Sequence, residues 1–267
     1  MNEKNPRLVS LIIPVYKQEK TIEKDLTRIK DVMDQMRYPY EIIVVVDGEL
    51  DNTEKNAKKV KAPNILVTGY PHNHGKGHAV RFGMARSKGD IVAFIDAGMD
   101  INPNGLSMLL EHFEWYNADI IVGSKLHPVS KVQYPITRKI LSWGYRFLVR
   151  VLFGLSIRDT QVGMKFFRRK VLEDVSPRLL VKTYAFDIEI LAVSNYLGYN
   201  RIFEAPVELD FSGVSSITQK GFWNTIFHML WDTMAVFYRL RILHYYDDKN
   251  NRKWKYDPEL NFKVNLP

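Results

Sequence analysis

Short runs of β-branched and apolar residues alternate with stretches of helical spacing throughout the first half of this 267-residue chain. Such alternation is typical of an α/β sheet whose parallel strands are joined by crossover helices. It predicts strands at 8–13, 41–46, 64–68, 90–95 and 120–122. It predicts helices between them at 19–36, 54–60, 76–87 and 104–116. The run at 41–46 is too apolar to have a solvated face, so we expect it to be a central parallel strand.

Two longer segments in the second half, 136–153 and 222–242, have amphipathic helical patterns. The first carries polar and basic residues at steps of four, which form one stripe on an otherwise apolar helix: Arg138, Ser142, Arg146 and Arg150. The second contains several charged residues and lacks the run of about 20 apolar residues that a spanning helix requires. We interpret both as helices that lie in a membrane interface, with packing on the sheet as the alternative.

These patterns divide the chain into a main domain at 1–217, which includes the segment 136–153, and a C-terminal part at 218–267. The C-terminal part is expected to be an amphipathic helix and a polar tail, with a loose appendage after Tyr246. The start, MNEKNPRLVS, has no apolar signal-peptide core, which favours a cytoplasmic protein held peripherally at the cytosolic face of a membrane. The lack of a spanning segment also favours a separate integral membrane partner.

Charge and cysteine content restrict the chemistry of the chain. Its lack of cysteine excludes disulfides, thiolate catalysis and cysteine-based metal sites. The balance of 38 Lys and Arg against 30 Asp and Glu gives a net charge of +8, which favours an anionic partner such as a nucleotide or a lipid headgroup. No RNA- or DNA-binding motif is present, so we expect no nucleic-acid partner.

Three carboxylates follow predicted parallel strands: Asp47 after the second, and Asp96 and Asp100 after the fourth. Ligands of open parallel sheets bind beyond the carboxyl ends of the strands, where these side chains would converge. Each one alone is more typical of a helix cap. Together they point to a function, because clustered carboxylates repel one another unless a cation or a donor group lies between them.

The sequence His74-Gly75-Lys76-Gly77 opens the predicted helix at 76–87. Such a turn directs backbone N–H groups and an ammonium group at a diphosphate, although glycines at helix starts are routine. It matches neither a P-loop nor a dinucleotide fingerprint. The seven histidines show no metal-binding spacing, and the pair His72 and His74 is interpreted as chance.

Four segments resemble successive blocks of the family-2 glycosyltransferases, which have the Rossmann-like GT-A fold: LVSLIIPVYKQEKTI, EIIVVVDGELDNT, NHGKGHAVRFGMARSKGDIVAFIDAGMD and ADIIVGSK. Two later segments resemble the branch that loads sugars onto polyprenyl phosphates, as dolichyl-phosphate β-glucosyltransferases and mannosyltransferases do: RKILSWGYRFLVRVLFGLSIRDTQVGMKFFRR and YAFDIEIL. The resemblance spans about residues 8–217 and implies that 1–217 is a GT-A catalytic domain.

The resemblance implies a nucleotide-sugar site at the strand ends. Pro14, Tyr16 and Asp47 would line the base and ribose pocket. Glu19 is a further candidate, because it is adjacent to Gln18, which occupies a position where an acid is common in the family. Lys76 would assist at the diphosphate. In this family the donor is a nucleoside-diphosphate sugar, so UDP-glucose and GDP-mannose are both candidates.

The resemblance also implies a divalent metal. Asp96 matches the first member of the family's Asp-x-Asp triplet, and Asp100 matches a further metal-contacting position. These hard oxygen ligands suit Mg²⁺ or Mn²⁺ on the donor diphosphate. Gly98 replaces the second acid of the triplet, and this departure favours the alternative of a non-catalytic nucleotide-binding relative.

An acceptor phosphate would be held by cationic side chains. Arg138 and Ser142 match the acceptor-phosphate region of the family, Lys125 takes the position of a family arginine, and Arg158 adds nearby charge. A lipid phosphate has a second pKa near 6 and is already a nucleophile at neutral pH, so its site needs positive charge rather than a general base.

Three further side chains are candidates for the catalytic set with Asp96. Asp159 and Gln161 are expected to contact the donor sugar or to position the acceptor, with a locally bonded loop acid as the alternative for Asp159. Asp187 and Glu189 are two residues apart and cannot share one face of a helix. We expect Asp187 to face the site.

The sequence therefore predicts an inverting glycosyltransferase. It would move glucose or mannose from a nucleotide sugar to a polyprenyl phosphate, such as dolichyl or undecaprenyl phosphate, at the cytosolic membrane face. The alternatives are a family-2 enzyme with a saccharide hydroxyl acceptor, for which Asp187 or Asp159 would be the base, and the non-catalytic relative.

Overall fold

A computed structural model describes residues 7–130, 136–183, 185–209, 222–249 and 253–266, without the side chains of 136–140, 222–225, 253, 265 and 266. Its centre is a seven-stranded sheet in the order β3-β2-β1-β4-β6-β5-β7. β6 is antiparallel to both neighbours, and the other pairings are parallel. The strands are β1 (Val9–Val15), β2 (Tyr40–Asp47), β3 (Ile65–Tyr70), β4 (Ile91–Ile95), β5 (Ile120–Ser124), β6 (Met164–Arg168) and β7 (Ile202–Pro206). The predicted mostly parallel α/β sheet is confirmed.

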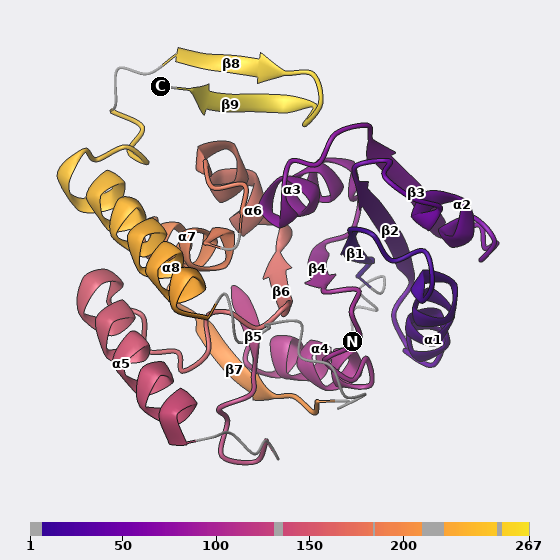
Figure 1. Cartoon of the computed structure of the whole chain (residues 1–267), viewed down its shortest axis with the longest axis horizontal. Helices are drawn as coiled ribbons and strands as arrows, with labels where there is room; N and C mark the ends of the chain where they lie inside the picture. Colours follow the sequence, from indigo (N-terminus) through magenta and orange to yellow (C-terminus); the bar gives the residue numbers. More distant parts are fainter. Residues whose placement is uncertain (1–6, 131–135, 184, 210–221, 250–252, 267) are drawn as a thin grey trace, which may run out of the picture.

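Helices flank this sheet on both faces (Figure 1). They are α1 (Ile22–Asp34), α2 (Thr53–Ala57), α3 (Lys76–Arg86), α4 (Gly105–Trp115), α5 (Ile136–Phe153), α6 (Arg169–Val175), α7 (Phe186–Tyr196) and α8 (Phe222–Phe237). A 3₁₀ turn (Ser176–Arg178) follows α6, and a π-helical turn (Tyr238–Ile242) continues α8. In the described ranges no helix combines the length and the apolar character needed to cross a membrane.

Two apolar layers hold the sheet. α1 and α4 bury their apolar faces against one side, and α3 and α7 bury theirs against the other. α5 and α8 extend the second layer through Val149, Phe153 and Val236. Burial follows the sequence pattern, since the four buried residues of α1 are spaced by three or four positions: Ile22, Leu26, Ile29 and Met33.

Two of the seven strands, β6 and β7, were not among the predicted runs. β6 has the sequence MKFFR, and the lysine at its second position obscures the apolar pattern of a strand. Lys165 is nevertheless fully buried. The strand ends directly at α6, so no turn signal marks its boundary.

Among the described residues after Tyr246, β8 (Lys253–Asp257) and β9 (Phe262–Leu266) pair as an antiparallel hairpin that packs on the core, so the expected loose appendage is wrong. Leu260 and Val264 are buried in the main core. The Arg86 guanidinium donates to the Glu259 carbonyl at 3.1 Å. Two apolar side chains among polar neighbours are too weak a pattern to predict this packing from sequence.

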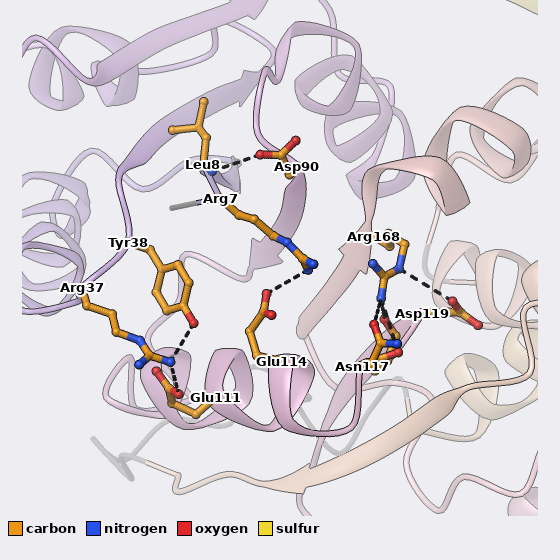
Figure 2. Close-up of polar contacts among 11 residues, drawn as sticks. Arg7, Leu8, Arg37, Tyr38, Asp90, Glu111, Glu114, Asn117, Asp119 and Arg168 are labelled. Atoms are coloured by element: carbon orange, nitrogen blue, oxygen red, sulfur yellow. Dashed lines mark hydrogen bonds and ion pairs between the residues drawn. The ribbon is translucent and has the colours of Figure 1, made fainter. Parts of the chain in front are cut away.

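Ion pairs and side-chain hydrogen bonds lie at the amino ends of the parallel strands (Figure 2). Arg7 before β1 pairs with Glu114 of α4 at 3.1 Å, and Arg168 of β6 donates to the Asn117 side chain at 2.8 Å. These contacts tie α4 and the start of β5 to the sheet. They lie at the edge opposite the one where Asp96 follows β4.

Packing of the hairpin makes Leu260 a core residue. We expect Leu260→Ala to lower the free energy of unfolding by about 2–5 kcal/mol, because the truncation leaves a cavity where the side chain was buried. Urea denaturation would measure this change. Lys263→Ala, at an exposed position of β9, is the matched control and should change stability little. Equal effects of the two substitutions would contradict the packed hairpin.

Candidate functional site

The site begins where β4 ends at the carboxyl edge of the sheet. Asp96 follows Ile95 directly, and its backbone N–H donates to the Gly163 carbonyl at 2.9 Å. A Cβ atom on Gly163 would lie 1.9 Å from Asp96 Oδ2. Glycine is therefore required at 163 for the Asp96 carboxylate to occupy this place.

Four charged side chains alternate in sign from Asp96 into the core, and we call Asp96, Lys76, Asp187 and Lys165 the acid–lysine ladder. Lys76 Nζ lies 2.9 Å from Asp96 Oδ1 and 3.0 Å from Asp187 Oδ2. Lys165 Nζ contacts Asp187 Oδ1 and donates to the Val162 carbonyl. The exposed fraction of the side chain falls along the ladder, from 46% at Asp96 to 0% at Lys165.

The charged side chains of the ladder can be buried because each one contacts a side chain of opposite charge. Burial alone would lower the pKa of Lys76, but Asp187 and Asp96 raise it above its ordinary value, so Lys76 is charged at neutral pH. Burial lowers the pKa of Lys165, and Asp187 opposes that shift. Two lysines and two aspartates alternate along the ladder, so each buried charge has an opposite partner, with Asp96 at the open end.

Glycines bring Lys76 to the ladder. Gly75 has a φ of +97°, which favours glycine, and a Cβ there would lie 2.5 Å from the Lys182 carbonyl oxygen. A Cβ on Gly77 would lie 2.7 Å from the Phe186 side chain. The start of α3 therefore lies directly against the start of α7, which carries Asp187.

Glu189 points away from the ladder. Its carboxylate accepts hydrogen bonds from the Leu180 and Val181 backbone N–H groups and from the Tyr246 hydroxyl at 2.8 Å. The structure thus separates the two acids of α7 as expected, with Asp187 on the ladder and Glu189 holding the segment before the helix.

Asp47 and Glu19 hold loops together. Asp47 is buried, and its carboxylate accepts hydrogen bonds from the backbone N–H groups of His74 at 2.7 Å and Gly75 at 3.0 Å. Glu19 accepts two hydrogen bonds from Asn52 at 3.2 Å. Both contacts shape the carboxyl edge of the sheet.

Pro14 and Tyr16 lie at the same edge, because β1 pairs in parallel with β2 in a register that matches Val15 with Val46. Pro14 is half-buried and Tyr16 is exposed. The structure therefore brings the four expected nucleotide residues to neighbouring strand ends.

The segment after Asp96 contains Gly98, which has few neighbours in the part of the chain that the structure describes. There, a Cβ on Gly98 would meet one atom within 4 Å, the Gln18 side-chain nitrogen at 3.8 Å. Asp100 is exposed and lies outside the acid–lysine ladder. The second acid of the expected triplet is absent from a position where the described residues leave room for a side chain.

Asp159 and Gln161 lie in the loop before β6. Burial raises the pKa of Asp159, and its carboxylate accepts hydrogen bonds from the Lys125 and Gln161 backbone N–H groups, both at 3.2 Å. The Gln161 amide donates to the Tyr145 hydroxyl at 3.4 Å, and that hydroxyl lies 3.1 Å from Thr233 Oγ1. This chain of contacts joins the loop to α5 and α8.

The residues expected to bind the acceptor phosphate differ in their exposure. Lys125 and Ser142 are half-buried, and Arg158 is exposed. The Arg138 side chain lies outside the described residues.

Lys165, Tyr145 and Thr233 belong to the site and were not predicted. A lysine inside the otherwise apolar run MKFF is the sequence signal that indicates a buried partner for Lys165. Tyr145 and Thr233 lie 88 residues apart on two amphipathic helices, and no local pattern indicates their contact.

Comparisons with known proteins agree with this geometry. Glycosyl transferase family 2 matches residues 10–176. A dolichyl-phosphate beta-glucosyltransferase of Trichomonas vaginalis is 30% identical over 88% of this chain and 75% of its own length. That of Drosophila melanogaster is 34% identical over 73% of this chain and 65% of its own length.

Solved structures show the same fold at low sequence identity. Glucosyl-3-phosphoglycerate synthase from Mycobacterium tuberculosis, in complex with Mn²⁺, uridine diphosphate and phosphoglyceric acid, has a TM-score of 0.62 at 19% identity. The match covers 98% of this chain and 87% of that chain.

The ladder predicts that substitution of its two aspartates lowers the free energy of unfolding by different amounts. We expect Asp187→Asn to lower the free energy of unfolding by about 3–5 kcal/mol, because it leaves the buried Lys165 and the half-buried Lys76 without their shared carboxylate. Asp96→Asn, at the open end, should cost about 1 kcal/mol or less. Urea denaturation compares the two variants, and a larger loss for Asp96→Asn would contradict the ladder.

Proposed function

The chain belongs to glycosyl transferase family 2, and we propose that it transfers a hexose from a nucleoside-diphosphate sugar to a polyprenyl phosphate. One observation carries this proposal: the loop before β6 contacts both the open end of the ladder and two helices with exposed apolar faces. The Gly163 carbonyl of this loop accepts from the Asp96 backbone N–H, and its Gln161 side chain contacts Tyr145 of α5, which contacts Thr233 of α8. The dolichyl-phosphate beta-glucosyltransferase relatives support the lipid acceptor, and they favour UDP-glucose over GDP-mannose.

The residues at the open end fit a divalent metal. The Asp96 carboxylate is half-exposed, and among the described residues only the Gln18 side chain comes within 4 Å of a Cβ built on Gly98. Asp96 would hold Mn²⁺ or Mg²⁺, with Asp100 as the second candidate from the same segment. When bound, the metal supplies positive charge for the diphosphate leaving group.

Lys76 would supply the protein's own charge to the diphosphate. Its ammonium group is fixed 2.9 Å from Asp96 and remains protonated because two carboxylates raise its pKa. A charge that is fixed before substrate binds costs no reorganisation as negative charge develops on the leaving group. Asp159 and Gln161 are proposed to contact the donor sugar or to position the acceptor.

A phosphate acceptor fits the ladder better than a sugar hydroxyl. A hydroxyl acceptor requires a general base, and both candidate carboxylates are already occupied. Asp187 contacts two ammonium groups, and Asp159 accepts hydrogen bonds from the Lys125 and Gln161 backbone N–H groups. Asp187 therefore serves to hold Lys76 in place. A lipid phosphate needs no base, and its attack on the face of C1 opposite the leaving group gives an inverted, β-linked product from an α-linked donor.

The helices α5 and α8 are proposed to dock on a membrane surface. Exposed apolar side chains follow helical spacing on both: Trp143, Phe147 and Val151 on α5, and Phe227, Trp231 and Met234 on α8. The two helices lie side by side (Figure 1). Arg150 is exposed on α5 and would meet anionic headgroups at the cytosolic face. In this proposal 1–217 is the catalytic domain, and α8 completes its docking surface.

Acceptor choice tests the proposed reaction. We expect turnover of UDP-glucose with an added polyprenyl phosphate and not with simple sugars. Asp96→Asn should lower this turnover by about 100-fold or more, because the donor diphosphate loses its metal ligand. Asp31→Asn, an exposed aspartate on α1, is the control and should be fully active. Turnover with simple sugars alone, or full activity in Asp96→Asn, would refute the proposal.

Vesicle binding tests the docking surface separately. We expect the double variant Trp143→Ser, Trp231→Ser to bind anionic vesicles at least about tenfold more weakly than the wild type, because it loses two exposed indole rings. Added salt should also weaken binding. Co-sedimentation measures both effects.

The matched control for vesicle binding is Trp115→Ser. Trp115 is 85% exposed but lies on α4, away from α5 and α8 (Figure 1). If Trp115→Ser weakened binding as much as the double variant, the surface on α5 and α8 would be wrongly assigned.

A further inference from the structure

We infer that the chain has a second metal site, made by His74, His78 and Glu259, which takes a transition-metal cation such as Zn²⁺. His74 lies in the turn before α3, His78 lies in the first turns of α3, and Glu259 lies in the turn of the β8–β9 hairpin. Two imidazoles and one carboxylate are a donor set that zinc accepts. The expectation that the histidines show no metal-binding spacing does not hold for His74 and His78, which are four residues apart and have ring centroids 4.7 Å apart. This inference does not depend on the proposed function.

The donor atoms are already close. One ligand atom from each of the three residues lies within 4.8 Å of the other two. His78 Nε2 and Glu259 Oε2 are 3.5 Å apart. Zinc bonds of about 2.0–2.2 Å in tetrahedral geometry separate two ligand atoms by about 3.4 Å. Small side-chain shifts therefore complete a three-ligand site, with the fourth position left for water.

His78 is the second, independent indication of a ligand. Its side chain is only 4% exposed, and among the described residues its Nε2 atom has no hydrogen-bond partner. A buried nitrogen of this kind costs free energy unless something binds it. The same atom faces the Glu259 carboxylate, where a cation would satisfy it.

The chemical state of His78 suits coordination. Burial, with His74, Lys182 and Arg81 nearby, lowers the pKa of His78 to about 4, so the imidazole is neutral at pH 7. A neutral imidazole is the form that binds a metal. The rings of His74 and His78 also pack on Tyr70, at centroid distances of 5.1 and 5.0 Å, which limits their movement.

Such a site would connect the hairpin to the open end of the ladder. His74 is two residues from Lys76, and the His74 backbone N–H group is bonded to Asp47. A cation shared with Glu259 would hold the hairpin on this turn. We therefore expect it to act as a clamp on the turn that presents Lys76.

Zinc binding by the full chain tests this site. After treatment with a chelator, the wild type should bind Zn²⁺ and its thermal midpoint should rise by roughly 5–10 °C when free Zn²⁺ is about a hundredfold above the dissociation constant. Glu259→Gln should weaken Zn²⁺ affinity by about tenfold or more. Because Glu259 is exposed, this variant tests the site without disturbing the core.

Two controls distinguish this site from zinc binding elsewhere on the chain. His72→Asn changes an exposed histidine next to the cluster and should leave Zn²⁺ affinity unchanged. Asp96→Asn should also leave it unchanged, since Asp96 belongs to the proposed donor site. Absence of Zn²⁺ binding, equal affinity in wild type and Glu259→Gln, or loss of binding in Asp96→Asn would each overturn the inference.

Discussion

Compensation of buried charge is the constraint on which the rest of the site depends. Lys165 is fully buried in the middle of a strand, and an isolated ammonium group there would be very unfavourable. Asp187 compensates it, and the remaining oxygen of Asp187 binds Lys76, which in turn binds Asp96. The position of the exposed acid is thus set by contacts that start in the core.

Two glycines allow neighbouring segments to approach closely enough for the ladder to form. Gly163 leaves room for Asp96, and Gly77 lets α3 lie against Phe186 at the start of α7. A side chain at either position would separate the charges that compensate one another. The ladder and its glycines therefore form one unit, in which the end of β4 and the elements β6, α3 and α7 each contribute one charged residue.

Much of the fold follows from the local pattern of the sequence. Apolar alternation predicts β1 to β5, and three- and four-residue spacing predicts α1 and α5, because these signals lie within one element. The strand ends also predict where Asp96 and Asp47 lie. Contacts between distant segments leave no such signal: β6 is interrupted by Lys165, and the hairpin buries only Leu260 and Val264 among its described residues. For the same reason, the sequence does not predict that His78 and Glu259 lie close together.

Coupling between metal and nucleotide at Asp96 is the central claim, and calorimetric titration measures it without any acceptor or membrane. The affinity for UDP would be determined with and without Mn²⁺ in the wild type and in Asp96→Asn. We expect Mn²⁺ to tighten UDP binding by at least about tenfold in the wild type and to leave it unchanged in Asp96→Asn. An equal effect of Mn²⁺ in the two proteins would contradict this coupling.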